Sequence, residues 1–392
     1  MILDESLTEP RTLQFGRRVR EMKAAGREMI SLGLGEPDFD TPEHVKEAAV
    51  EALRAGLTRY SEAAGLPELR ELIARKLRSD NGIEAEPDEI LITPGAKNAL
   101  FLACCALLRP GDEAINFTPC YVSNHPILKL AEPQVVVHHV RLTPGEFRVD
   151  RDRVRSLVNE RTKLIFISYP NNPTGKMLDR DDSEFIRGLT REHSLHLLSD
   201  EIYDLLPLTG KPHISPAASA DIREQVVTVN GFSKAYAMTG WRIGYAHAPR
   251  PVLTLMTRIH EHLNTNTAAF VQKAAVAALT GPQGHLKEFI ARLKRNAGRL
   301  EAFLAARPRL RSAPVEGGFF AFVDISATGL ASDHFCTRLL EETGVVIIPG
   351  IAFGDDFDGW VRVSLAVSEE AFVTGLSRIG EFVERAGKEP GG

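Results

Sequence analysis

Asn-Gly-Phe-Ser-Lys-Ala-Tyr-Ala-Met-Thr-Gly-Trp-Arg-Ile-Gly occupies residues 230–244, and the rest of the chain is best understood as support for the lysine within it. The apolar run at 226–229 predicts a strand, so Lys234 leaves the sheet just beyond a strand end. Arg242 follows between two glycines, which allow the backbone to pass close to a bound group. The segment therefore predicts a binding site at the end of a strand.

A lysine and an arginine in this arrangement suit a phosphorylated aldehyde. A lysine amine becomes nucleophilic when burial or a nearby cation lowers its pKa, and it can then form a Schiff base. A guanidinium is always charged, and its fork shape matches phosphate. The pair indicates pyridoxal phosphate (PLP), whereas the alternative interpretation is a solvated surface lysine and half of a surface ion pair.

Length and composition narrow the class of protein. A chain of 392 residues exceeds what one hydrophobic core usually supports, so two domains are expected. With 43% hydrophobic residues, 25% charged residues and a net charge of −5, the chain has no basic surplus for nucleic acid or a membrane. The acidic N-terminus lacks a signal pattern, and the four cysteines lack metal or redox spacing, so a cytoplasmic location is expected.

Strand and helix patterns alternate over about 200 residues. Strands are predicted at 113–117, 134–138, 163–168, 195–199 and 226–229, and helices near 122–131, 150–158, 179–193 and 215–223. This alternation predicts an α/β fold with a mostly parallel central sheet and helices on both faces. Ligands bind at the carboxyl ends of strands in such sheets, and Ala96, Asn172, Asp200 and Lys234 all follow predicted strands.

The pattern changes in the last third of the chain. Residues 251–306 are predicted to be helical, and shorter strands near 319–324, 345–350 and 360–365 follow, with a helix at 333–343. We expect three parts: an N-terminal segment at 1–40 that joins the small domain, a large PLP-binding domain at 41–280, and a small C-terminal α+β domain at 281–392.

Several motifs together resemble one enzyme family. Ser-Lys-x-x-x-Met-x-Gly-x-Arg-x-Gly at 233–244 resembles the lysine motif of the class I/II aminotransferases, which are PLP-dependent transferases of fold type I. Asn-Asn-Pro-Thr-Gly at 171–175, Ser-Asp-Glu-Ile-Tyr at 199–203 and Arg-Val-Ser-Leu at 362–365 occur in the family's order. The resemblance covers the chain from Gly35 to Arg362 and is nearest to the aspartate-aminotransferase-like branch.

This resemblance implies a role for each matching residue around the cofactor ring. Lys234 would hold PLP as an aldimine and, once released, would move a proton as general base and acid. Asp200 would keep the pyridine nitrogen protonated, as an electron sink requires. Tyr203 and Asn172 would hydrogen-bond the phenolic oxygen, and Tyr121 would stack on the ring.

The resemblance also implies a phosphate site and a dimer. The expected phosphate ligands are the backbone of Ala96 and Lys97, the guanidinium of Arg242, and Tyr60 from the other subunit of a homodimer. Many relatives add a hydroxyl three residues before the lysine, and Gly231 stands there instead. Ser233 carries a hydroxyl next to the lysine, and whether it contacts the phosphate stays open.

The expected substrates are an L-amino acid and a 2-oxo acid. Arg362 would bind the substrate α-carboxylate as a bidentate pair, with Gly35, Asn172 and Tyr121 beside it. The donor stays open between aspartate, an aromatic amino acid and other common amino acids, with 2-oxoglutarate expected as acceptor. Asn124 departs from the relatives, which are expected to carry a tyrosine there, and this difference affects the shape of the substrate pocket.

Three alternatives remain beside an aminotransferase. A carbon–sulfur β-lyase, a decarboxylase-like enzyme or an aminocyclopropane-forming synthase would use the same cofactor residues. A PLP-fold sensor domain of a transcription regulator would need a DNA-binding domain before residue 35, where we expect none. A metal hydrolase built on Asp200, Glu201 and His260 or His262 lacks ligand spacing, so no metal is expected.

Overall fold

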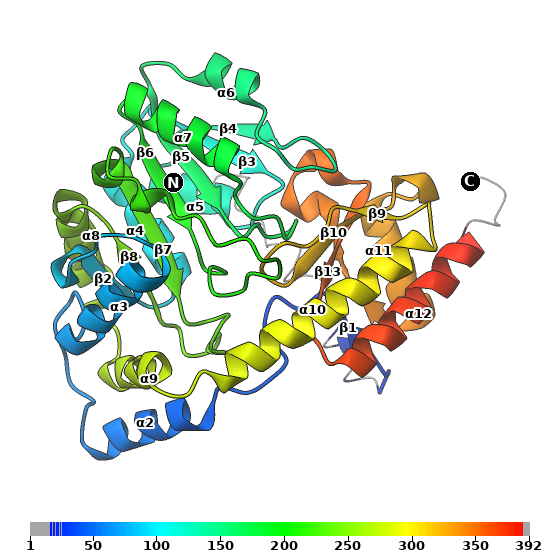
Figure 1. Ribbon diagram of the computed structural model, residues 1–392, viewed down its shortest axis with the longest axis horizontal. Helices are drawn as coiled ribbons and strands as arrows, with labels where there is room; N and C mark the ends of the chain where they lie inside the picture. The colour runs from blue at the N-terminus through cyan, green and yellow to red at the C-terminus, as the bar shows by residue number, and fades with distance from the viewer. Residues whose placement is uncertain (1–15, 18, 20, 23, 25, 387–392) are drawn as a thin grey trace.

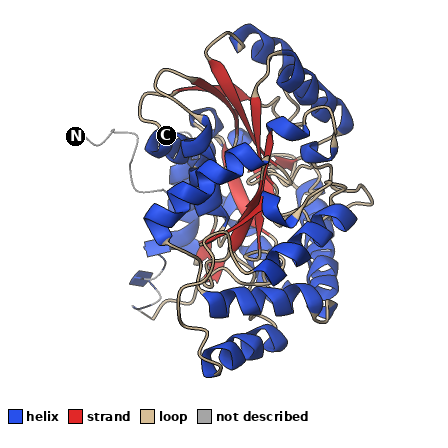
Figure 2. Ribbon diagram, turned by 90° about the vertical axis from the view of Figure 1, so that its left-hand side faces the viewer, coloured by secondary structure: helices blue, strands red, loops and turns tan. Residues whose placement is uncertain are grey.

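The computed structural model describes residues 16–386 except positions 18, 20, 23 and 25 (Figure 1). These residues form a seven-stranded sheet, a four-stranded sheet and a two-stranded pairing. Helices lie on both sides of the large sheet, as Figure 2 shows. The predicted α/β architecture is therefore confirmed.

The large sheet has the strand order β2-β8-β7-β6-β5-β3-β4. Its strands are β2 (Ile90–Thr93), β3 (Glu113–Thr118), β4 (Val136–Arg141), β5 (Thr162–Ser168), β6 (His196–Asp200), β7 (Val226–Gly231) and β8 (Gly244–His247). Strands β4, β3, β5, β6 and β7 pair in parallel, whereas β8 is antiparallel to both of its neighbours. Strand β8, which begins only two residues after Arg242, was not predicted from the sequence.

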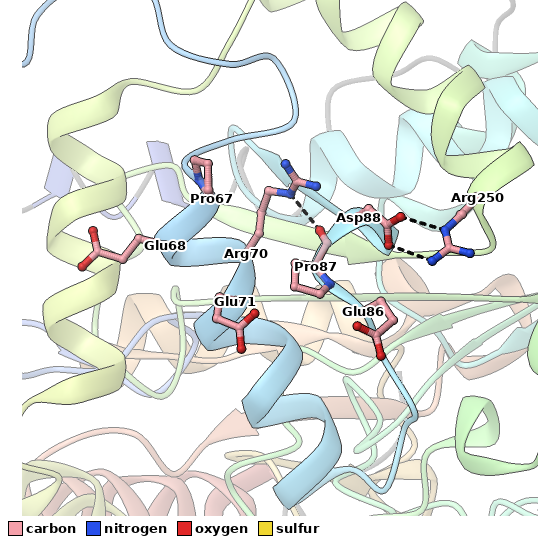
Figure 3. A pocket seen from close by; sticks show the side chains of 8 residues that line it. All are labelled: Pro67, Glu68, Arg70, Glu71, Glu86, Pro87, Asp88 and Arg250. Carbon is pink, nitrogen blue, oxygen red and sulfur yellow. Dashed lines mark hydrogen bonds and ion pairs between the residues drawn. The ribbon is translucent and has the colours of Figure 1, made fainter.

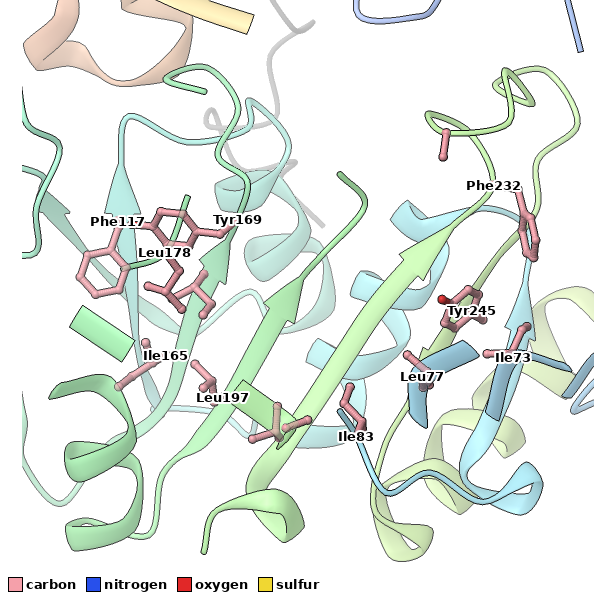
Figure 4. Packing of buried hydrophobic residues seen from close by; sticks show 14 of the residues in the cluster. Ile73, Leu77, Ile83, Phe117, Ile165, Tyr169, Leu178, Leu197, Phe232 and Tyr245 are labelled. Carbon is pink, nitrogen blue, oxygen red and sulfur yellow. The ribbon is translucent and has the colours of Figure 1, made fainter. Parts of the chain in front are cut away.

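Two hydrophobic clusters cover the faces of this sheet because alternate strand residues point to opposite sides. Ile165 and Leu197 belong to one cluster, into which Ile73 and Leu77 of helix α3 (Pro67–Asp80) also pack (Figure 4). Leu164 and Phe166 point to the other face and pack with α4 (Ala96–Leu107) and α8 (Arg250–Asn264). A strand buried on both faces carries apolar residues without alternation, as the run at 164–167 does.

The helices associated with this sheet are α2 (Glu43–Arg54), α3 (Pro67–Asp80), α4 (Ala96–Leu107), α5 (Asn124–Ala131), α6 (Arg151–Leu157), α7 (Arg180–Glu192), α8 (Arg250–Asn264) and α9 (Ala269–Thr280). The helix expected around 215–223 is wrong. That segment forms only the 3-10 turns Pro216–Ala218 and Arg223–Gln225. It contains Pro216 and polar residues, and it packs as a turn that leads into β7.

A smaller antiparallel sheet forms in the C-terminal third. Its order is β12-β13-β10-β9, with strands β9 (Arg311–Ser312), β10 (Phe320–Asp324), β12 (Ile348–Pro349) and β13 (Trp360–Ser364). The helices α10 (Gly284–Ala305), α11 (Ser332–Thr343) and α12 (Glu369–Ala386) lie around it (Figure 1). One hydrophobic cluster fills most of this unit and also includes Tyr203, Leu206 and Leu208, whereas Phe322, Ile348 and Trp360 of the small sheet pack into the cluster of the large sheet.

The segment near residue 30 joins the C-terminal unit. Strand β1 (Ile30–Ser31) pairs in parallel with β11 (Val345–Val346), and Leu32 belongs to the C-terminal hydrophobic cluster. These contacts support the proposal that the N-terminal segment joins the small domain. Among the residues described, no helix has the length and apolar character needed to cross a membrane.

Candidate active site

A cavity of about 610 Å³ opens where the carboxyl ends of the large sheet face the N-terminal segment and strand β13. Eleven of the residues singled out in the sequence line it: Gly35, Ala96, Lys97, Tyr121, Asn172, Asp200, Tyr203, Ser233, Lys234, Arg242 and Arg362. Tyr60 is absent from this lining, and it lies on the surface of the chain with 86% of its area exposed. One protomer thus assembles the expected constellation except for the tyrosine predicted to come from a partner.

Lys234 lies three residues beyond strand β7, with its amine inside the cavity. Its Nζ donates a hydrogen bond of 2.6 Å to the carbonyl oxygen of Gly35. Burial, and then the positive charge of Arg362, lower the pKa of Lys234 to about 8. An appreciable fraction of this amine is therefore uncharged near neutral pH, as a nucleophile or proton acceptor requires.

Asp200 ends strand β6 and is 6% exposed. Its Oδ1 accepts a hydrogen bond of 3.2 Å from the backbone N–H of Ile202. Burial raises the pKa of Asp200 to about 6; the neighbouring Glu201 adds to the rise, and the Ile202 bond and Lys234 oppose it. A buried carboxyl of this kind gains most from a cationic N–H partner.

Arg362 enters the cavity from strand β13, where it pairs with Phe322 of β10. It is 5% exposed; its Nη1 donates to Asn172 Oδ1 at 3.1 Å and its Nη2 to the carbonyl oxygen of Gly33 at 2.8 Å. The guanidinium also lies 4.0 Å from the ring centre of Phe320. Burial lowers the pKa of Arg362 to about 10.

The charge of Arg362 is not balanced by a carboxylate. Among residues 16–386, as far as they are described, no ion pair reaches it, and its buried Nε has no hydrogen-bond partner. A buried cation without an anion is costly unless one binds. The position is thus suited to an anionic ligand, and a planar carboxylate matches the guanidinium fork.

A second anion site lies at the start of helix α4. Gly95 precedes the helix with φ 83° and gives it no capping side chain, so the first backbone N–H groups remain available. A Cβ on Gly95 would lie 2.5 Å from Arg242 Nη2. Arg242 itself has φ 53°, and its Nη1 donates to the carbonyl oxygen of Thr239 at 2.9 Å. This close approach places a fixed cation beside a helix N-terminus, an arrangement that suits phosphate.

The missing hydroxyl before the lysine has a steric reason. A Cβ on Gly231 would lie 3.0 Å from Cα of Gly244 and 3.1 Å from the carbonyl oxygen of Ile243. Strands β7 and β8 approach each other there, with Gly231 opposite Gly244 in the register. A serine or threonine at 231 would push these strands apart, so the site depends on other phosphate ligands.

Aromatic side chains line the two sides of the cavity. Lys97 Nζ lies 5.5 Å from the ring centre of Tyr121. Tyr203 packs edge-on against Phe319, with ring centres 5.3 Å apart, and burial raises the pKa of its hydroxyl well above the ordinary value. The hydroxyl therefore stays protonated and can donate a hydrogen bond.

The sequence analysis missed part of the lining. Leu34, Leu100, Val122 and Ile202 add apolar surface, and Ser168 lies beside Asp200. Leu34 is flanked by glycines and exposed, and this Gly-Leu-Gly string was the one available signal. No group of three or more His, Cys, Asp or Glu side chains in the described part of the chain is arranged to hold a metal ion.

Comparison with known proteins places these observations in a family. The family model for aminotransferase class I and II matches residues 27–379. The chain is 36% identical over 385 residues to the aspartate aminotransferase of Geobacillus stearothermophilus, with 97% of each protein covered. It is 39% identical over 382 residues to the aspartate/prephenate aminotransferase of Thermus thermophilus, with 96% of each covered.

Solved structures agree with this assignment. The Thermus thermophilus aspartate aminotransferase with maleate superposes with a TM-score of 0.90 at 37% identity, covering 97% of this chain and 99% of that one. An aromatic aminotransferase from Pyrococcus horikoshii gives a TM-score of 0.88 at 36% identity, covering 94% and 99%. The similarity therefore extends over both sheets and the cavity between them.

Proposed function

Because this chain belongs to the class I and II aminotransferases and is a PLP-dependent transaminase of fold type I, we propose that Lys234 is its cofactor-binding and proton-transferring residue. The observation that carries this assignment is the meeting of Lys234, Asp200 and Arg362, three buried or half-buried charges, in one cavity. Burial lowers the pKa of Lys234, as a proton acceptor requires, and it disfavours the charged forms of Asp200 and Arg362, so both of these gain from a bound partner of opposite charge.

The residues present fit PLP. The helix α4 N-terminus and Arg242 would hold its phosphate, and the close approach of Arg242 to Gly95 supports this. Asp200 would face the pyridine nitrogen, with Tyr203 and Asn172 near the phenolic oxygen and Tyr121 on the ring face. When bound, PLP draws electrons away from the substrate α-carbon. Ser233 also lines the cavity, and its contact with the phosphate remains part of the proposal.

Lys234 performs the proton transfer in this scheme. Its Nζ would take the proton from the substrate α-carbon as general base and would then donate it as general acid. With a pKa of about 8, the amine can both accept and release a proton near neutral pH. Its hydrogen bond to Gly35 directs Nζ toward the segment that also borders the substrate site.

Arg362 would hold the substrate by its α-carboxylate. Asn172 and Gly33 occupy Nη1 and Nη2 on one side of the guanidinium and fix its plane. The remaining N–H groups of the fork, including that of Nε, which has no hydrogen-bond partner among the described residues, would be available to a substrate carboxylate, with Gly35 beside it. This geometry orients the α-carbon toward Lys234 before any proton moves.

We further propose a dicarboxylic substrate pair, aspartate as donor and 2-oxoglutarate as acceptor. Relatives are named aspartate aminotransferases. Lys97 supports this choice because it lines the cavity, is exposed within it, and forms no ion pair with an acidic side chain among the described residues. It is available to bind a second carboxylate.

A donor panel tests the substrate. Each amino acid is added to the holoenzyme, and conversion of bound PLP to its amine form is followed by absorbance. Lys97→Met should lower kcat/KM for aspartate by roughly 10- to 100-fold, because one charge-assisted hydrogen bond is lost. In the same variant, kcat/KM for the donors alanine and phenylalanine should change little. An equal loss for every donor would remove Lys97 from substrate recognition. Steady release of pyruvate and ammonia without an acceptor would indicate the β-lyase alternative.

A homodimer with Tyr60 donated to the partner's site completes the proposal. Tyr60 is exposed in one protomer, as are Val50 and Leu53 of α2 and Leu263 of α8. Co-expression of Lys234→Ala with Tyr60→Ala tests it, since mixed dimers would contain one site with both residues intact. Recovered activity supports donation across the interface, and no recovery places Tyr60 in its own protomer's site or outside the site. We also propose a cytoplasmic location, since the four cysteines are free thiols.

A further inference from the structure

A buried polar cluster lies behind the strand ends that carry Asp200 and Lys234. Glu201 is 1% exposed and accepts hydrogen bonds from Ser199 Oγ at 2.9 Å and Ser215 Oγ at 2.8 Å. His213 Nε2 lies 2.8 Å from its Oε2, and the His213 side chain is 7% exposed. A carboxylate this deeply buried needs such donors to remain charged.

A second carboxylate continues the cluster toward helix α3. Asp204 forms an ion pair with Lys76, and Asn81 Nδ2 donates to Asp204 Oδ2 at 3.1 Å and to Glu201 Oε2 at 3.4 Å. The positive charge of the Lys76 ammonium balances the negative charge of Asp204. Only a protonated His213 can then compensate Glu201, so the net charge of the cluster depends on that imidazole.

The environment favours a protonated His213. Burial disfavours its charged form, but Glu201, through its charge and hydrogen bond, and then Asp204 together raise the pKa of His213 above the ordinary value, with Lys76 opposing them. Tyr245, whose hydroxyl stays protonated because burial raises its pKa, also lies within the field of Asp204 and Glu201. Tyr236, whose pKa burial raises to about 12, lies within the field of Lys76, Asp204 and Asp80, and Asp200 lies within that of Glu201.

The cluster is joined to both strand ends. Glu201 directly follows Asp200, and its backbone N–H donates to the carbonyl oxygen of Val229 in β7 at 2.8 Å. Asn230 lies near Asp204, and its Oδ1 accepts a hydrogen bond from the N–H of Gly231 at 2.7 Å. A change in the cluster's charge therefore acts within one or two residues of the strand ends that lead to the cavity.

We propose that Glu201 and His213 form a buried charge pair that sets the electrostatic potential at Asp200, and through it the proton affinity of the group that Asp200 faces. They act as positioning residues, because neither lines the cavity. The proposal rests on the proposed function only in identifying that group as the pyridine nitrogen of PLP. Substrates and chemistry are unchanged by it.

Charge-changing substitutions should act in opposite directions. Glu201→Gln removes a negative charge beside Asp200, so the Asp200 carboxylate is stabilised and cations in the cavity are stabilised less. His213→Gln leaves Glu201 uncompensated and strengthens the negative potential. If the two substitutions acted only by disturbing the packing, the proton affinity of the group that Asp200 faces would shift in the same direction in both variants.

The first measurement uses the holoenzyme. The pH-dependent absorbance of bound PLP should shift its midpoint down by about one pH unit in Glu201→Gln and up by about half a unit in His213→Gln, as expected for one charge at this range in a partly screened site. Glu201→Asp, which keeps the charge, should titrate near the wild type. Shifts of the same sign, or no shift in either variant, would overturn the proposal.

The matched control is a second buried carboxylate paired with a histidine; here the histidine, His138, is partly exposed and Arg161 also pairs with the carboxylate of Glu113. Glu113 is the first residue of strand β3, so it lies at the opposite end of the strands from the cavity. Its Oε2 lies 2.8 Å from His138 Nε2. Glu113→Gln should lower the unfolding midpoint as Glu201→Gln does, yet leave the PLP absorbance titration unchanged. A shift of the PLP titration in this control as large as that in Glu201→Gln would show that stability, not local charge, is responsible.

A measurement on the apoprotein separates this inference from the proposed function. The His213 ring is titrated by NMR in the wild type and in Glu201→Gln. The carboxyl carbon of Asp200 is titrated in the wild type, in Glu201→Gln and in His213→Gln. The Asp200→Asn variant assigns the signal of that carbon. The His213 pKa should fall by at least one unit in Glu201→Gln. The Asp200 pKa should fall in Glu201→Gln and rise in His213→Gln, and if it does neither the charge pair has no influence at the site. These values do not require PLP, so they hold even if PLP proves to bind elsewhere.

Discussion

Two hollows in this protein have nearly equal volumes, about 610 Å³ for the cavity at the strand ends and about 620 Å³ for a depression beside α3. The depression is lined by charged residues of two helices and a turn (Figure 3). Its Asp88 and Arg250 side chains are 57% and 61% exposed and pair with each other at 2.8 Å. In the cavity, Asp200 and Arg362 are buried and form no ion pair with each other among the bonds found.

The difference shows what makes a hollow reactive. Exposed, mutually paired charges are screened by water and leave little free energy for a ligand. Buried charges that come from different strand ends have shifted pKa values and need a partner, so a ligand supplies what the protein does not. Volume alone does not distinguish the two hollows, whereas desolvation and convergence of the charges do.

The largest expected effect comes from the cavity lysine. Lys234→Ala should lower kcat/KM by about 10⁴-fold or more, because both the nucleophile and the proton acceptor are removed. The assay follows 2-oxo acid formation, and borohydride reduction with peptide mapping shows whether PLP is attached at residue 234 in the wild type. Near-wild-type turnover in the variant would remove this lysine from the chemistry.

Replacement of Arg362 in the cavity should have the next largest effect on activity. Arg362→Lys keeps the charge but loses the planar fork, and also the bond to either Asn172 or Gly33. We expect KM for amino acid and oxo acid to rise by about 100-fold, with a smaller change in kcat. Binding of a carboxylate such as maleate, measured by absorbance change, should weaken in parallel. A loss confined to kcat would point instead to a role in proton transfer.

The pH dependence of PLP capture tests the lowered pKa of Lys234. Below pH 8 most of the amine is protonated and unreactive, so the capture rate should rise with pH and level off about one pH unit above the pKa of about 8. Between pH 6 and pH 8 the increase should be roughly fifty-fold, from the fraction of free amine. The rate is measured by stopped-flow absorbance on the apoprotein. A rise that continues to pH 10 would indicate an amine with an unshifted pKa.

The smallest effect is expected in the depression. Arg250→Ala removes an exposed ion pair with Asp88, and kcat/KM should stay unchanged because nothing there faces the cavity. The unfolding midpoint should also stay within experimental error. Loss of activity in this variant would show that the two hollows are coupled, which would contradict the contrast drawn between them.

Much of the site could be predicted from the sequence because its residues follow strands of a single sheet. Alternation of strands and helices predicts the parallel order, and parallel strands bring their carboxyl ends to one edge. Asn172, Asp200 and Lys234 come together for this reason. The missed strand β8 and the wrong helix at 215–223 are short segments, in which periodicity gives little information.

The sequence by itself determined which residues are proposed for the chemistry and which strands they follow, since short motifs and local periodicity specify turns, strands and helices. Only the tertiary structure decided how Arg362 meets Gly33 and Asn172, and how His213 meets Glu201. These contacts join segments that are distant in the chain, and they form only when packed sheets bury the charges. Burial then shifts the pKa values of the residues in the cavity, and no local pattern of residues encodes burial of that kind.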